Sequence, residues 1–228
     1  MIKLLIVNYD YQVKTLKEIK FSTVSRVFFL ASFLTVLFHF LLHPLKVLNM
    51  STSMFYMDEE LTLASILTVS FAFYCGILAL EYFLKSKKLH DFLWILIFWG
   101  LAIDEYFSIH EYLNDLFKKN FSGNNLLNEL ASLSWVFTLG IIFLLISLFI
   151  IREVIKERDK SVKLLQLLGI ITYITVIGVE VIGGQTYGST IYVLFVGIEE
   201  GLEMIGTVFF IEAFRNKLLT NKNGRIKD

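Results

Sequence analysis

Apolar side chains dominate six stretches of the chain, and most charged residues gather between these stretches. Each stretch contains at least 18 residues. A helix of about 20 residues crosses the roughly 30 Å of hydrocarbon in a bilayer. The pattern therefore predicts an all-α, polytopic membrane protein with six transmembrane helices. The predicted spans are residues 27–45, 61–84, 92–113, 130–151, 164–182 and 191–214.

Composition supports a membrane protein. Of the 228 residues, 56% are hydrophobic and 15% are aromatic, the mean hydropathy is +0.66, and there is one proline. These values lie well outside the usual range of soluble domains. The net charge is zero, so the charge balance itself does not indicate a partner. From the apolar composition we expect the lipid bilayer, and no nucleic acid, as a partner.

The basic residues fall very unevenly on the two sides of the predicted spans. Eighteen of the 21 Lys and Arg residues lie in the N-terminal segment, in the loops after the second and fourth spans, or in the tail. Lys46, Lys118 and Lys119 lie on the opposite side. By the positive-inside rule, both termini are cytoplasmic. We expect a multi-pass protein of the cell (inner or plasma) membrane. Trp94, like the other tryptophans, is expected to face lipid or to pack in the core, and it is also a candidate anchor at the membrane interface.

The predicted organisation has three parts. Residues 1–24 form a segment at the membrane surface, residues 25–216 the six-helix domain, and residues 217–228 a cytoplasmic tail. We expect no cleavable signal peptide, because the chain starts with an apolar run of only five residues. The single Cys75 lies inside the second span, which excludes an intrachain disulfide.

Ionisable side chains interrupt four of the predicted spans at similar depths. The third span contains "AIDEYFSIHEY" and the sixth contains "GIEEGLEM". Counted from the helix ends at about 1.5 Å per residue, these residues lie between the membrane midplane and its outer surface. The candidate site residues are Asp104, Glu105, His110, Glu111, Glu180, Glu199, Glu200, Glu203, His39 and His43.

Helical geometry places the acids of each span on one face. On an ideal helix with 100° per residue, Asp104, Glu105 and Glu111 of the third span share an arc of about 120°. His110 lies about 120° from Asp104 on the other side. The three glutamates of the sixth span share an arc of about 100°. We therefore expect two polar stripes that face the bundle interior, with His110 facing a different neighbour.

No basic residue accompanies these acids, since residues 92–117 and 164–214 contain neither Lys nor Arg. An ionised Asp at a helix centre costs about 2.5–3.5 kcal/mol, so the cluster needs compensation. Bound cations, shared protons, histidine partners or a water-filled cavity can provide it. Carboxylate sites favour hard cations, and mixed Glu/His sites favour iron, manganese or zinc. We predict that the ten candidate residues hold a divalent metal ion: Ca, Mn, Fe or Zn.

A short alignment indicates an internal repeat. Placing "AIDEYFSIHE" over "GIEEGLEMIG" pairs Asp104 with Glu199 and Glu105 with Glu200. Halves of three spans each would form a 3+3 inverted repeat, and such repeats meet at a midplane site in many transporters. In the sixth span, Gly197-x-x-x-Gly201 is a step of small residues that allows a neighbouring helix to approach closely.

The two acidic signatures resemble those of an uncharacterised group of prokaryotic six-span membrane proteins. That group carries an acidic pair followed by His-Glu in one helix and Glu-Glu-x-x-Glu-Met-x-Gly in the last. The resemblance covers about twenty positions and implies a shared set, but no activity. The set is Asp104, Glu105, His110, Glu111, Glu199, Glu200 and Glu203.

A second likeness concerns the first span. Its "HFLLH" step, His39 to His43, is similar to the intramembrane histidines of zinc hydrolases of the alkaline ceramidase and adiponectin receptor type. Here the step lies on the first span and not on the last. Their catalytic residues are therefore not carried over to this chain.

Three functions fit the sequence. The favoured one is a carrier or channel for a metal cation or proton-coupled solute, with Glu111 and Glu180 at the outer entrance. The second is an intramembrane metal-dependent enzyme, a hydrolase or oxidase, that acts on a lipid-like substrate with Glu111 or Glu180 as general base. The third is a structural subunit of a membrane complex. A homo-oligomer is also compatible with the sequence.

Overall fold

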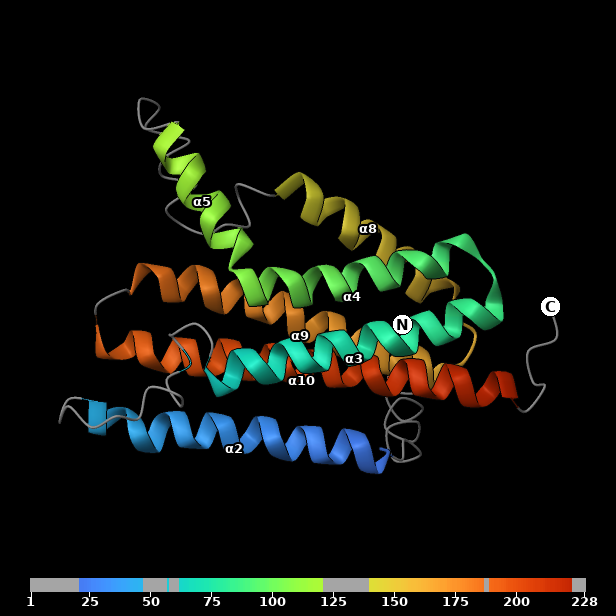
Figure 1. Ribbon diagram of the computed structural model, residues 1–228, viewed down its shortest axis with the longest axis horizontal. Coiled ribbons are helices and arrows are strands. Elements are labelled where there is room, and N and C mark those ends of the chain that lie inside the picture. The colour runs from blue at the N-terminus through green and yellow to red at the C-terminus, as the bar shows by residue number, and fades with distance from the viewer. Residues whose placement is uncertain (1–20, 47–56, 58–61, 121–139, 187–188, 223–228) are drawn as a thin grey trace, which may run out of the picture.

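The computed structural model describes residues 21–46, 57, 62–120, 140–186 and 189–222. Within these ranges every regular element is a helix (Figure 1), which confirms the predicted all-α class. The helices are α2 (Thr23–Lys46), α3 (Leu63–Ser86), α4 (Leu89–Phe107), α5 (Ile109–Asn120), α8 (Gly140–Lys156), α9 (Lys160–Gln185) and α10 (Thr190–Lys222).

Three helices are long and apolar enough to cross a membrane, as expected of a membrane protein. They are α3, α9 and the part of α2 from Thr23 to Leu42. Helix α4 has 19 residues and α10 has 33, but α4 contains three carboxylates and α10 contains four. Helices α3 and α9 each contain one carboxylate, so α4 and α10 carry most of the acids of the described helices. Much of the predicted fourth span, before Gly140, lies outside the described residues.

Helix α10 lies at the centre of the bundle. It packs against α2, α3 and α9, while α4 packs against α3. Figure 1 shows α2, α3, α4, α9 and α10 lying along one common direction. Between α3 and α4, Lys87 adopts a left-handed conformation with φ of 56° and donates its N–H to Phe83 O at 2.8 Å. This left-handed turn reverses the chain direction, so α4 packs antiparallel to α3.

The small-residue step of α10 is the contact surface for α2. A Cβ added at Gly197 would lie 2.6 Å from Cζ of Phe40, and one at Gly201 would lie 2.7 Å from Cγ2 of Val36. Both separations are shorter than van der Waals contact, so only glycine allows this approach without a shift. The predicted close approach at Gly197 and Gly201 is confirmed.

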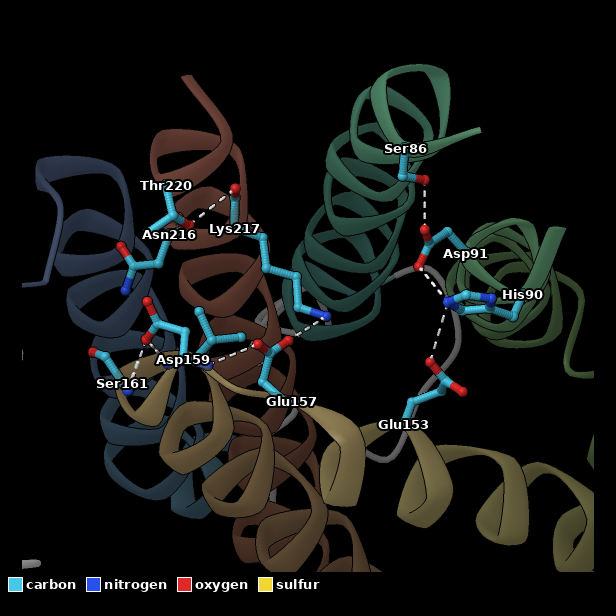
Figure 2. Close-up of polar contacts among 11 residues, drawn as sticks. Ser86, His90, Asp91, Glu153, Glu157, Asp159, Ser161, Asn216, Lys217 and Thr220 are labelled. Carbon is cyan, nitrogen blue, oxygen red and sulfur yellow. Dashed lines mark hydrogen bonds and ion pairs between the residues drawn. The ribbon is translucent and has the colours of Figure 1, made fainter. Parts of the chain in front are cut away.

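Four segments that carry basic residues meet at one end of the bundle, which we call the basic end. It comprises residues 21–26, 81–91, 152–163 and 212–217. Ion pairs and hydrogen bonds link these segments, and Figure 2 shows those between the last three. The linking contacts are Lys217 Nζ to Glu157 Oε2 (2.8 Å), His90 Nε2 to Glu153 Oε2 (3.5 Å), and Ser22 Oγ to Glu212 Oε2 (2.7 Å).

The third predicted span is not one continuous helix. Helix α4 ends at Phe107, Ser108 has a φ of 47°, and α5 begins at Ile109. A residue other than glycine rarely adopts this left-handed conformation, and it ends the α-helix here. Figure 1 shows α5 leaving the direction of α4. The prediction of an unbroken helix over 92–113 is therefore wrong, as are the angles calculated across Ser108.

Candidate functional site

The acids of α4 and α10 lie at the same level of the bundle. Asp104 follows Asp91 by 13 residues, and Glu203 precedes Lys217 by 14 residues. At 1.5 Å per residue, Asp104 and Glu203 are each about 20 Å along their helices from the basic end. The two polar stripes thus overlap in depth, because both helices start or end at the same side.

Glu203 is the centre of a carboxylate cluster built by three helices. Its charge interacts with those of Glu199 and Glu200 on α10, Glu105 on α4 and Glu180 on α9. All five side chains are half-buried. The structure therefore brings four of the candidate residues close enough for their charges to act on a fifth, Glu203.

A buried hydrogen-bond pair adjoins this carboxylate cluster. The Thr207 hydroxyl donates to the backbone oxygen of Glu203 at 3.0 Å, and the Tyr173 hydroxyl lies 2.7 Å from Thr207 Oγ1. Since Thr207 has only one hydroxyl proton, Tyr173 is the donor to Thr207. The Tyr173 hydroxyl also interacts electrostatically with Glu203 and Glu105. Sequence reasoning did not single out Tyr173, because one tyrosine among ten gives no signal of its own.

Asp104 binds His110 directly across the break between α4 and α5. Asp104 Oδ1 accepts the backbone N–H of His110 at 2.9 Å, and Oδ2 lies 2.9 Å from the imidazole Nδ1. The predicted orientation, in which His110 faces a different neighbour from Asp104, is wrong. The left-handed Ser108 changes the chain direction and turns His110 toward the carboxylate.

His39 bonds to backbone groups of two other segments. Its side chain is 1% exposed, Nε2 lies 3.1 Å from Val193 O, and Nδ1 accepts the Met57 N–H at 3.2 Å. A neutral imidazole with its proton on Nε2 satisfies both contacts. In this arrangement His39 holds α2 against the start of α10, and both ring nitrogens are occupied.

The predicted metal site stays a prediction. Among the described side chains, no group of three or more His, Cys, Asp or Glu residues is arranged to hold a metal ion. The side chains of His43 and Glu111 lie outside the described part of the structure. The carboxylates of the cluster could contribute oxygen ligands to a cation such as Ca or Mn, whereas Fe or Zn would also need imidazole.

Aromatic rings fill the region between the carboxylate cluster and the basic end. Trp94 is 0% exposed, and its ring centroid lies 5.5 to 6.0 Å from those of Phe98, Phe149, Phe210 and Phe214. These rings come from α4, α8 and α10, and we call them the aromatic layer. Trp94 is thus a core residue, in agreement with its expected packing role and not with the alternative of an interfacial anchor.

Comparison with protein families places the chain in a defined group. A domain of unknown function, DUF8692, matches residues 26–216. The chain belongs to this family. No curated protein and no solved structure matches it. The range matched by DUF8692 includes the carboxylate cluster, the Asp104–His110 contact and the aromatic layer.

Proposed function

We propose that this protein is a membrane carrier or channel for a metal cation or proton-coupled solute, which the carboxylate cluster binds. The observation that supports this most strongly is the interaction of Glu203 with acids of α4, α9 and α10. Neighbouring carboxylates in a region of low dielectric repel one another unless a proton or cation lies among them. A cluster of this kind exchanges cations for protons.

The proposal includes six spans with both termini in the cytoplasm. In its support, the start of α2, the α3–α4 turn, the α8–α9 turn and the last turns of α10 meet at the basic end. An even number of crossings separates these segments in the proposed topology. The positive-inside rule assigns the basic end to the cytoplasm.

The aromatic layer supports access to the cluster from the opposite side. Phe210 and Phe214 lie between Glu203 and Lys217 along α10, and they pack on Trp94 of α4. In the proposed mechanism, a cation or solute reaches the carboxylates from the side of the α4–α5 break. Release to the cytoplasm then requires these rings to separate.

The proposal also includes the predicted 3+3 inverted repeat. The aligned signatures lie at the same depth on α4 and α10, which agrees with two related halves. They differ in local structure, since Ser108 ends α4 while the aligned Glu203 lies inside the continuous α10.

Flux measurements in proteoliposomes test the proposal. With a pH-sensitive dye inside the vesicles, we expect proton movement on addition of a cation gradient of Ca²⁺, Mn²⁺, Fe²⁺ or Zn²⁺. Glu203→Gln removes the central carboxylate at nearly constant volume and should reduce the flux at least tenfold. Glu81→Gln is the matched control, because Glu81 is an exposed glutamate that pairs with Lys85 on α3.

Two outcomes would overturn this function. Flux no greater than in empty vesicles for every cation would contradict it and favour the enzyme or structural-subunit alternatives. Full flux in Glu203→Gln would show that the carboxylate cluster is not the binding site. Elemental analysis of the purified protein by mass spectrometry measures the predicted metal independently of flux.

A further inference from the structure

The basic end carries an excess of positive charge that the proposed function does not use. Its four segments contain eleven basic and six acidic residues. Several of the acids point inward, since Asp91 is 4% and Glu153 is 8% exposed, whereas Lys87, Lys88 and Arg158 are exposed. The surface is therefore more positive than the composition alone indicates.

The inward-facing acids are engaged within the protein. Asp91 accepts a 2.5 Å hydrogen bond from Ser86, Glu157 pairs with Lys217, and Asp159 caps the first turn of α9 (Figure 2). At the start of α2, Glu212 accepts the hydroxyl groups of two serines. These contacts hold the negative charges away from the exposed basic side chains. The exposed basic side chains can therefore bind anions from outside the protein.

Four exposed basic residues lie where apolar helices end. Lys87 and Lys88 follow the last residue of α3, Arg152 lies in the last turns of α8, and Arg158 lies between α8 and α9. Within the described residues, their side chains have no carboxylate within 4 Å. Helices α3 and α9 are long and apolar enough to span a membrane. In the proposed topology the turns at their ends therefore lie near the lipid headgroups.

Exposed apolar side chains lie within three residues of these charges in the sequence. Leu84 is 52%, Leu89 is 80% and Ile155 is 68% exposed. A free phosphate ion makes no favourable contact with apolar side chains, whereas a lipid carries acyl chains next to its charged headgroup. The pairing of basic and apolar side chains thus favours a lipid as the ligand.

We propose that Lys87, Lys88, Arg152 and Arg158 form a binding surface for the headgroups of anionic lipids. Basic residues next to a membrane attract anionic headgroups, and their contributions add up. The bound headgroups would join the α3–α4 turn to the α8–α9 turn. This inference does not depend on transport by the carboxylate cluster.

Native mass spectrometry of the full-length protein tests the proposal. The protein in detergent is mixed with equal amounts of phosphatidylglycerol and phosphatidylcholine, and the lipids that remain bound are counted. We expect retention of phosphatidylglycerol over phosphatidylcholine, falling at high salt. The variant K87Q/K88Q/R152Q/R158Q should weaken this preference about tenfold or more.

Two further variants complete the design. K118Q/K119Q removes two basic residues of α5, away from the basic end, and should retain the preference. K87Q/K88Q changes only exposed side chains of one turn and gives a partial loss even if the fourfold variant fails to fold. Equal retention of both lipids by the wild type, or an unchanged preference in K87Q/K88Q, would overturn the proposal. Displacement by millimolar inorganic phosphate would assign the surface to free phosphate instead.

Discussion

Asp104 and His110 are joined by two contacts of 2.9 Å, one to the backbone N–H and one to the imidazole Nδ1 of His110. The backbone contact satisfies a donor in the first turn of α5, as a capping side chain does at a helix N-terminus. One carboxylate thus fixes both the start of α5 and the direction of the histidine ring.

This relationship predicts different effects of substitutions at the two residues. Asp104→Ala removes both contacts and should destabilise the first turn of α5 by about 0.5–2 kcal/mol. His110→Ala removes only the imidazole contact and keeps the backbone hydrogen bond. Hydrogen exchange at residues 110–113 should therefore accelerate more in Asp104→Ala. Equal exchange in the two variants would contradict the capping role of Asp104.

The contact of α10 with α2 predicts a steric effect at Gly201. Gly201→Ala places a Cβ 2.7 Å from Cγ2 of Val36 and should destabilise the protein by about 1–3 kcal/mol through overpacking. Gly178→Ala is the matched control, because a Cβ there meets no atom within 4 Å. The free energy of unfolding in detergent, measured for both variants, tests this effect. The double variant Gly201→Ala, Val36→Ala should regain stability, and failure to do so would exclude this clash as the cause.

The hydrogen bond of Tyr173 predicts a functional effect without a large loss of stability. Tyr173→Phe removes the donor to Thr207, at a cost of about 0.5–1.5 kcal/mol. It also removes a hydroxyl that interacts electrostatically with Glu203 and Glu105, so the pH profile of flux should change in the proteoliposome assay. Tyr112→Phe, at a 67% exposed position, is the control. An unchanged pH profile in Tyr173→Phe would show that this hydroxyl does not act on the cluster.

The sequence predicts how deep a side chain lies in this bundle better than it predicts the direction in which that side chain points. A helix rises by a constant amount per residue, so counting along α4 and α10 correctly places Glu105 and Glu203 at one level. The angle between Asp104 and His110 depends on an unbroken helix, and the left-handed Ser108 has no sequence signal comparable to glycine or proline. The partner of His39 is likewise unpredictable, because Val193 O belongs to a helix 154 residues away in sequence.

Side-chain type alone does not distinguish a core position from an interfacial one for Trp94. Tryptophan near a predicted helix end is typical of membrane interfaces, but the rings of α8 and α10 enclose this one. Its environment depends on which helices pack together, and hydrophobic periodicity does not specify that. The Gly197-x-x-x-Gly201 step was more informative, since two small residues one helical turn apart allow close packing whichever helix is the partner.

The break at Ser108 has an electrostatic consequence for a protein whose acidic spans contain no basic residue. Helix α5 begins beside Asp104, so the unpaired N–H groups of its first turn direct positive partial charge toward that carboxylate. The backbone itself thereby stabilises one anion of the bundle. An intact helix through this position would have left Asp104 without that half-charge.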